Sequence, residues 1–295
     1  MATMRVLGKD WKKGEVLLAD GAWGTQLFQR GLPSGHAPED WNLTHPDQVR
    51  EVARAYREAG SRIVLTNSFG GNRFTLEAHG LGDRLREVNE TAARLTAEAV
   101  GSQAIVAGDI GPSGKILSVD PVTPEDLLRT FHDQAAALRD GGAQWIVVES
   151  MQDMEEMGLA VEAAKKATGL PVVASMTYSL GAHGFRTMMG NAPQDCVRRA
   201  MDAGADLIGA NCGAGIDAYV PLAPILRALT ALPLWIKANA GIPRVEGGRT
   251  VYPLDARQYA SYVPALVAAG VDVIGGCCGT TPAHILEVGR ILAGR

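Results

Sequence analysis

Three of the four cysteines in this sequence of 295 residues follow short apolar runs that end in glycine-bearing turns. Cys212 lies in "NCG", and Cys277 and Cys278 are adjacent in "GGCCGTTP" (275–282). Neighbouring side chains on a flat strand point to opposite faces, so a strand interior cannot direct both sulfur atoms to one site. Both can reach one site if the strand ends there and the chain turns, and the flanking glycines supply the backbone freedom for such a turn.

Three thiolates with an open fourth position are typical of a catalytic zinc site, because thiolate ligands favour zinc over magnesium or calcium. The spacing of Cys212, Cys277 and Cys278 does not match a zinc-finger pattern. Buried apolar cysteines, or a disulfide between Cys277 and Cys278, therefore remain open alternatives. The fourth cysteine, Cys196, lies within the helical pattern "PQDCVRRAMDAG", and we expect an inert thiol there.

A zinc ion held by three thiolates activates water poorly, because its ligands already donate much negative charge. It is better suited to hold a fourth thiolate, which it keeps deprotonated below the free thiol pKa of about 8.5. The chemistry that follows is alkyl transfer to sulfur, with the substrate thiolate as nucleophile and no separate protein nucleophile.

Eight apolar runs, each followed by a helical pattern, must position these cysteines. Eight such units without a compositional break predict a (β/α)8 TIM barrel, one domain over residues 1–295. The alternative is an open doubly wound sheet, which usually carries a GxGxxG loop that "DGAWGT" does not match. The runs cover residues 15–24, 62–71, 104–112, 145–153, 172–179, 206–213, 234–241 and 272–279.

Polar residues gather where these predicted strands end, which is the active face of a barrel of this kind. Two long irregular segments, 30–42 and 179–193, are candidate lids beside that face. The polar residues at the strand ends, besides the cysteines, are Asp20, Gly21, Thr66, Asn67, Asp109, Glu149, Asn211 and Asn239.

Composition excludes several other classes of function. The formal net charge is −4, without a long basic block, which argues against a nucleic-acid partner. The sequence has no apolar run of the roughly 18 residues that a membrane span needs and no secretory signal pattern. We therefore expect a cytoplasmic protein with no membrane partner.

Seven motifs, in this order, resemble the homocysteine S-methyltransferase family. The resemblance covers nearly the whole chain and is greatest to the homocysteine-binding barrel of cobalamin-dependent methionine synthase. Betaine–homocysteine and S-methylmethionine–homocysteine methyltransferases are similar at a greater distance. The motifs are "DGAWGTQL", "TNSFGGNR", "GDIGPSG", "ES", "NCG", "NAGIP" and "GGCCGTTP".

The resemblance implies a (β/α)8 barrel in which Cys212, Cys277 and Cys278 bind Zn²⁺ and the sulfur of homocysteine is the next ligand. The product would be methionine. The family also implies substrate contacts, with Asp20-Gly21 at the amino-acid end of homocysteine and Glu149 accepting hydrogen bonds from its α-ammonium group. Thr66 and Asn239 would line the same pocket, and Asp109 stays open between a binding and a structural role.

Each of these positions also has an ordinary structural interpretation. Asp20 can cap a helix or hold a turn, Glu149 can pair with a neighbouring cation, and Asn239 can shape the turn before Gly241. The chain departs from the family at Gly213, where relatives often have a polar residue. It departs again at 237–238, where relatives close to methionine synthase often have Glu-Pro and this chain has Lys-Ala.

The methyl donor is not fixed by the sequence, in which we find neither a cobalamin module nor a folate-binding barrel. One expectation is a separate corrinoid protein that carries methylcobalamin, with or without a folate-linked partner that acts through it. A small onium compound is another, and it would need an aromatic cage. The wording of "GGCCGTTP" favours the corrinoid protein. The candidate cage residues are Trp23, Phe69, Tyr178 and Phe185.

Three alternatives to a homocysteine methyltransferase remain open at this point. One is a non-catalytic thiol-binding subunit of a corrinoid methyltransferase complex, and another is a methyltransferase for a different thiol. The third is a redox barrel with a disulfide between Cys277 and Cys278.

Overall fold

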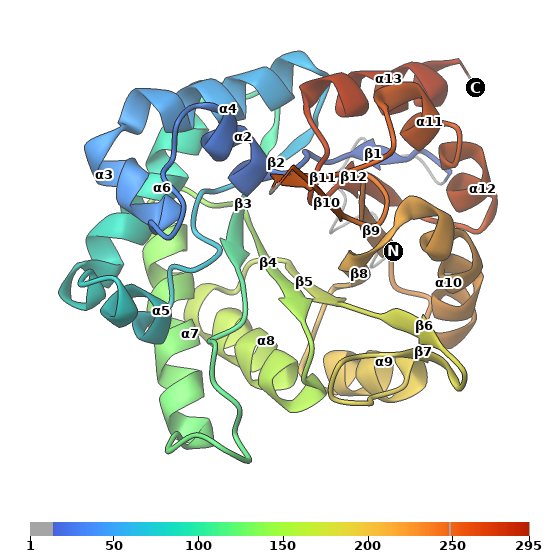
Figure 1. The fold of residues 1–295 in the computed structure, drawn as a ribbon. Helices are drawn as coiled ribbons and strands as arrows, with labels where there is room; N and C mark the ends of the chain where they lie inside the picture. The colour runs from blue at the N-terminus through green and yellow to red at the C-terminus, as the bar shows by residue number, and fades with distance from the viewer. Residues whose placement is uncertain (1–13, 248, 295) are drawn as a thin grey trace.

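The computed structural model describes residues 14–247 and 249–294 and confirms the predicted (β/α)8 barrel (Figure 1). Its eight strands pair in parallel in the order β1-β12-β9-β8-β5-β4-β3-β2. A further parallel bridge between Ala19, directly after β1, and Ile63 of β2 joins the two ends of this order and closes the ring. The strands are β1 (Leu17–Leu18), β2 (Ile63–Leu65), β3 (Ile105–Ile110), β4 (Trp145–Met151), β5 (Val172–Met176), β8 (Leu207–Gly215), β9 (Leu234–Asn239) and β12 (Val273–Gly276).

Helices lie outside the strands and cover the barrel (Figure 1). None of the helices in the described part of the chain is long and apolar enough to cross a membrane. The helices are α2 (Trp23–Gln29), η1 (Pro38–Asp40), α3 (Trp41–Thr44), α4 (Pro46–Glu58), α5 (Arg73–Ala78), η2 (Gly82–Arg84), α6 (Leu85–Val100), α7 (Pro124–Asp140), α8 (Met154–Thr168), α9 (Pro193–Asp202), α10 (Ile216–Leu229), α11 (Ala256–Ala260), α12 (Val263–Ala268) and α13 (Pro282–Ala293).

Local sequence explains where the helices begin and why the strands are apolar. Helix α7 starts with a capping box between Thr123 and Asp126, with Pro124 in its first turn. All five residues of β5 are buried, as expected for a parallel strand with side chains in the barrel interior and against the helices. Cys196 on α9 is buried in the apolar core, which agrees with the inert thiol expected there.

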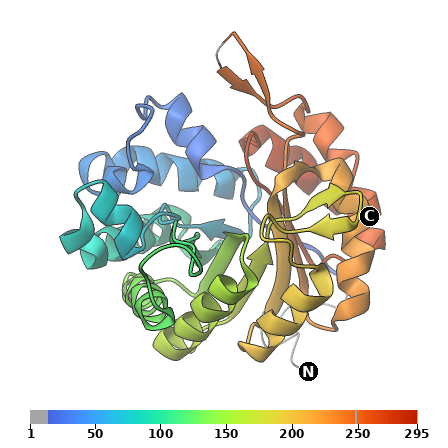
Figure 2. The same ribbon diagram turned by 60° about the horizontal axis from the view of Figure 1, so that its bottom comes forward.

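Two hairpins were not predicted from the sequence. The segment 179–193, expected to be irregular, contains β6 (Ser179–Gly181) paired with β7 (Gly184–Arg186). After β9, strands β10 (Arg244–Glu246) and β11 (Arg249–Val251) form a second hairpin, which projects away from the barrel (Figure 2). Both follow barrel strands at their carboxyl ends, so they stand beside the predicted active face.

The segment 30–42, the other candidate lid, is tied to its neighbours. It contains η1, and its Glu39 side chain is buried. Glu39 Oε1 accepts a hydrogen bond of 2.6 Å from the backbone N–H of Gly70, in the loop after β2. This contact anchors the segment to the barrel rim.

Helices α6 and α7 pack so closely that Gly141, just after α7, leaves no space for a side chain. A Cβ atom there would collide with the carbonyl oxygen of Glu90 and lie 2.8 Å from the Cβ of Ala93. The colliding atom belongs to the backbone of α6, so a side-chain rotation cannot relieve the contact.

We therefore predict that Gly141→Ala lowers the free energy of unfolding by about 1–3 kcal/mol, the usual cost of overpacking. Urea denaturation followed by circular dichroism measures this. The matched control is Gly24→Ala in α2, where an added Cβ meets nothing closer than 4.0 Å. That control should change stability by less than about 1 kcal/mol. Equal stability of both variants would contradict the close α6–α7 contact.

Candidate metal centre and active site

The three predicted metal ligands come together at the carboxyl ends of β8 and β12. The sulfur atoms of Cys212, Cys277 and Cys278 all lie within 4.8 Å of one another, and the three residues are half-buried. A tetrahedral zinc ion with Zn–S bonds of about 2.3 Å requires sulfur atoms about 3.8 Å apart. The cluster therefore fits a three-thiolate zinc site after small side-chain adjustments.

A turn at the end of β12 directs both adjacent cysteines to this cluster, as the sequence predicted. The backbone N–H of Cys277 donates to the carbonyl of Ala238 at 2.7 Å, which extends the pairing of β12 with β9. The N–H of Thr280 then donates to the carbonyl of Cys277 at 3.1 Å and closes the turn. Gly279 has a φ of 81°, a left-handed conformation that favours glycine.

The reason inferred from sequence for the two preceding glycines was wrong. Gly275 and Gly276 lie within β12 and have no positive φ. A Cβ at Gly275 would lie 2.7 Å from the carbonyl oxygen of Asp20, and one at Gly276 would lie 2.7 Å from the side chain of Thr280. Close packing, rather than backbone freedom, requires glycine at these two positions.

An irregular end of β8 presents Cys212. The pairing of β8 with β9 shifts register between Asn211 and Gly215, and Cys212 itself has a left-handed φ of 60°. Gly213 follows with a φ of 63°, and a Cβ there would lie 2.6 Å from the side chain of Thr177. This backbone strain and packing explain the glycine where relatives often have a polar residue.

Buried Asn211 connects the cluster to neighbouring strands, a role that the sequence analysis did not identify. Its Oδ1 accepts from the N–H of Ser150 at 2.8 Å and from Ser175 Oγ at 2.7 Å. Its Nδ2 donates to Ser150 Oγ at 2.7 Å and lies 3.9 Å from Cys277 Sγ. A strand-end asparagine directly before a ligand cysteine was the available signal.

The three thiol groups are hydrogen-bonded to one another. Hydrogen bonds from Cys277 and then Cys278 lower the pKa of Cys212 to about 3, and the side chain of Asn239 also donates to it. The hydrogen bond with Cys212 raises the pKa of Cys278 to about 11. Cys212 is therefore the first thiolate of the cluster, and a bound cation would replace the shared protons.

Asp20 lies at the same end of the barrel, and its carboxylate is fully buried. Its Oδ1 forms an ion pair of 2.7 Å with Lys237 Nζ. Its Oδ2 accepts from Trp23 Nε1 at 2.9 Å and from the N–H of Leu65 at 2.8 Å. Protein donors thus hold this carboxylate in place, and its predicted contact with substrate stays a prediction.

Gly21 and Thr66 both take part in packing or hydrogen bonding within the barrel. A Cβ at Gly21 would lie 2.8 Å from Thr280 Oγ1 and 2.9 Å from the ring of Tyr56. Thr66 Oγ1 accepts a hydrogen bond of 3.0 Å from the N–H of Asp109 and forms a hydrogen bond of 2.6 Å with Ser68 Oγ. These structural roles leave their predicted substrate contacts untested.

Three acceptor oxygens in this region have no partner. Among the described residues, Asp109 Oδ1, Glu149 Oε2 and Asn239 Oδ1 are buried without a hydrogen-bond donor. Burial raises the pKa of Glu149 to about 7, and burial followed by the charge of Glu149 raises that of Asp109 well above its usual value. An unpaired buried acceptor costs about 1–3 kcal/mol, so this arrangement indicates a ligand that supplies donors.

Two of the four candidate cage residues form hydrogen bonds through their polar groups. Trp23 directs its indole N–H to Asp20, and the Tyr178 hydroxyl is hydrogen-bonded to the Cys196 thiol of α9. Phe185 is buried, whereas the ring of Phe69 is 42% exposed. Two of the four side chains are thus directed to other partners.

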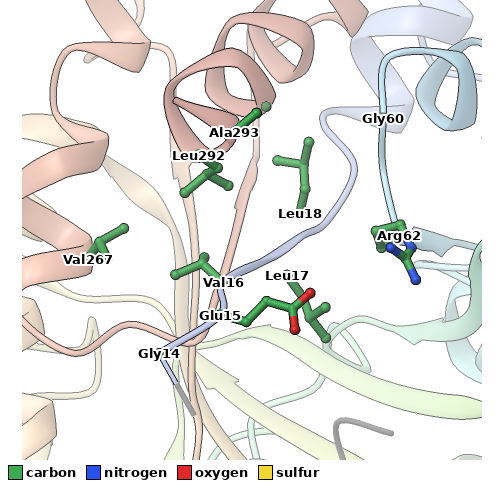
Figure 3. A pocket seen from close by; sticks show the side chains of 11 residues that line it. Gly14, Glu15, Val16, Leu17, Leu18, Gly60, Arg62, Val267, Leu292 and Ala293 are labelled. Atoms are coloured by element: carbon green, nitrogen blue, oxygen red, sulfur yellow. The ribbon is translucent and has the colours of Figure 1, made fainter. Parts of the chain in front are cut away.

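A separate cleft of about 560 Å³ lies at the opposite end of the barrel (Figure 3). Gly14–Val16 and Gly60–Arg62 border it just before β1 and β2 begin, and the end of α13 covers another side. No predicted site residue lies there, and the chemistry-bearing groups are at the carboxyl ends of the strands.

The fold and site define a barrel with a cluster of three cysteines that could hold a metal ion and with unpaired acceptors at the same end. The family model described as homocysteine S-methyltransferase matches residues 17–292. The chain belongs to this family, which confirms the family that the sequence resemblance predicted.

Methionine synthases are similar to this chain at the level of sequence. The enzyme of Mycobacterium tuberculosis is 31% identical over 94% of the chain, and that of Mycobacterium leprae is 29% identical over 94%. The chain spans about a quarter of the length of these relatives.

Among solved structures, the Escherichia coli homocysteine methyltransferase MmuM in its metallated form has a TM-score of 0.80. It is 24% identical, and the match covers 98% of this chain and 99% of MmuM. The carboxyl transferase domain of Rhizobium etli pyruvate carboxylase has a TM-score of 0.54 at 19% identity, covering 95% of this chain and 47% of that one. At these identities the matches support the fold.

If the cysteine cluster holds zinc, we predict that Cys277→Ser removes the metal and the methyltransferase activity without unfolding the barrel, because the three cysteines lie half-buried at the rim rather than in the core. Metal analysis should fall from about one zinc per chain to near zero. The matched control is Cys196→Ser, which should retain its zinc. A barrel that unfolds at Cys277→Ser would instead identify the metal as structural.

Glu149 gives a second prediction, about pH and stability. Its pKa of about 7 in the folded protein exceeds the value of 4.5 for the free side chain, so the folded state binds more protons between these values. Stability should therefore fall as pH rises from 5 to 7.5 in the metal-free protein. Glu149→Gln should flatten that decline in urea unfolding, and Glu58→Gln, at an exposed site on α4, should not. A decline that persists in Glu149→Gln would assign it to other groups.

Proposed function

We propose that this chain transfers a methyl group to the thiolate sulfur of homocysteine to give methionine, with Zn²⁺ held by Cys212, Cys277 and Cys278. The observation that carries the proposal is the convergence of the three sulfur atoms within 4.8 Å. Buried acceptors without partners lie at the same end of the barrel. The E. coli methyltransferase with the same fold has been solved in a metallated form, which also supports a metal.

Zinc, when bound, lowers the pKa of the acceptor thiol so that sulfur is a nucleophile at neutral pH. The protein's share is to hold the ligands rigidly. The turn at Cys277 is fixed by two backbone hydrogen bonds, and Asn211 and Asn239 direct side-chain N–H groups toward Cys277 and Cys212. Such donors orient the thiolates and moderate their negative charge.

The unpaired acceptors suit the α-ammonium group of homocysteine. Glu149 Oε2 and Asn239 Oδ1 both lack donors, and an ammonium group supplies three. The turn at Asp20-Gly21 lies at the same end and is available to the carboxylate side of the substrate. Binding both ends of the amino acid would orient its thiol toward the three cysteines and hold it for in-line attack.

In the transfer itself, the new bond joins the acceptor sulfur to the methyl carbon. The bond from methyl carbon to the donor breaks, and the donor keeps that electron pair. The acceptor thiol has lost its proton to solvent before the attack, so the chain needs no nucleophile of its own.

A methyl-corrinoid protein is the donor class that we favour. The wording of "GGCCGTTP" (275–282) resembles that of the corrinoid-using relatives and supports this donor class. The methionine synthases similar to this chain are about four times longer, which is consistent with a donor that other protein segments supply. An acceptor thiol other than homocysteine, or a subunit that binds thiol without catalysis, is the second candidate.

A donor panel tests this proposal. We expect zinc-loaded protein to form methionine from homocysteine with a methyl-corrinoid protein or with methylcobalamin. S-Methylmethionine and betaine are small onium donors that need an aromatic cage in the protein, and we expect them to give rates at least about 10-fold lower. Cys277→Ser, which lacks the metal, is the inactive control for each donor.

Other outcomes separate the alternatives. Zinc and homocysteine binding without methionine from any donor would indicate a non-catalytic thiol-binding subunit. Purified protein without zinc that loses two thiols on oxidation would indicate the redox barrel. Higher rates with a different thiol would change the acceptor and leave the chemistry in place.

A further inference from the structure

Lys237 on β9 places a positive charge inside the barrel, directly below the cysteine cluster. Lys237 is 2% exposed. Its side chain reaches across β12 to Asp20, which follows β1, and its Nζ lies 2.7 Å from Asp20 Oδ1. Gly275 of β12 makes this crossing possible, because a Cβ there would lie 3.1 Å from Lys237 Cγ. The barrel is therefore shaped to bring this ammonium group to the site.

The ammonium group of Lys237 has donors to spare. It carries three N–H bonds, and in the part of the chain that the structure describes its one hydrogen-bond acceptor is Asp20 Oδ1. The ring of Trp235, 5.8 Å from Nζ at its centroid, covers one side. Burying an ammonium group with unused donors costs free energy, as does burying an acceptor that has no donor.

The surrounding charges keep Lys237 protonated. Burial alone lowers its pKa, but the negative charges of Asp20 and then Glu149 raise it, and the net direction is upward. Lys237 is not the sole hydrogen-bond donor to Asp20 among the described residues. The other carboxylate oxygen, Oδ2, accepts from Trp23 and from Leu65. The cation is thus held by the carboxylate of Asp20 and is also stabilised by the charge of Glu149.

We propose that Lys237 binds the α-carboxylate of the acceptor thiol and makes the site specific for thiols that carry an amino-acid head group. The inference rests on the proposed function. Glu149 and Asn239 offer unpaired acceptors for an ammonium group, and Lys237 offers unpaired donors for a carboxylate at the same end of the barrel. Asp20 is then a positioning residue that aims Lys237 through their ion pair.

The competing role for Lys237 is that of a counter-charge, which would only neutralise Asp20 and Glu149. The two roles differ in their dependence on the ligand. A counter-charge affects all thiols alike, whereas a carboxylate-binding group affects only thiols that have a carboxylate.

The first test needs no variant. Calorimetry on zinc-loaded protein compares homocysteine with 3-aminopropane-1-thiol, which is the same molecule without its carboxylate. Charge-assisted hydrogen bonds of this kind predict binding of homocysteine about 10- to 100-fold tighter. Equal dissociation constants for the two thiols would overturn the inference, whatever any variant does.

The second test uses Asp20→Asn/Lys237→Met, which removes both charges of the ion pair together, so that Asp20 is not left as a buried carboxylate without its cation. We expect its preference for homocysteine over 3-aminopropane-1-thiol to fall to about 3-fold or less, with the affinity for the latter nearly unchanged. Lys166→Met, at an exposed position on α8, is the control that keeps the full preference. Circular dichroism confirms that each variant is folded.

The outcomes distinguish this inference from the proposed function. Retention of the full preference in the double variant overturns the role of Lys237 while homocysteine binding stands. Failure of every thiol to bind zinc-loaded wild-type protein overturns the proposed function, and the inference with it. Loss of affinity for both thiols by the same factor identifies Lys237 as a counter-charge.

Discussion

The position of β12 between β1 and β9 is the constraint on which the site depends. This strand carries Cys277 and Cys278 at its end, and its neighbours carry Asp20 and Lys237. Its last two residues, Gly275 and Gly276, lack side chains because the carbonyl of Asp20, the side chain of Lys237 and the side chain of Thr280 occupy that space. A side chain at either glycine would displace the ion pair or the turn that presents the cysteines.

The balance of hydrogen bonds divides the polar residues of the site into those with internal partners and those with an unpaired oxygen. Asp20, Thr66 and Asn211 are buried with internal donors or acceptors, so they stabilise the geometry. Glu149 and Asn239 are equally inaccessible but each retains an oxygen without a donor. Keeping such groups costs folding free energy, and proteins retain that cost where a ligand recovers it.

The fold could be predicted from the sequence because its signals are local. Seven of the eight predicted runs contain a whole barrel strand and the run 206–213 contains all but the end of β8, since each run combines a buried apolar segment with a turn and a helix. The β10–β11 hairpin was missed because "RVEGGRTV" is polar and short. Its strands pair only with each other, so no pattern of core residues reveals them.

The site was predicted in part, for a physical reason. The cysteines were identified from their positions at the ends of predicted strands and from the family resemblance, whereas their spacing alone left other roles open. Lys237 was visible only as a departure from related sequences, because its partner Asp20 is 217 residues away and the ion pair depends on barrel closure. The structural roles of Gly275 and Gly276 likewise depend on atoms of distant strands, which spacing alone does not reveal.

In the proposed transfer, the depth of each group determines the side from which the donor approaches. Asp20, Glu149 and Lys237 are buried within the barrel, whereas the three cysteines are half-buried at its rim. An acceptor amino acid bound between them would enter head group first and leave its sulfur nearest to solvent. The donor must then approach from outside the barrel, in line with that sulfur. Such an approach does not require an internal cavity for the donor, and it suits a methyl group that another protein surface presents.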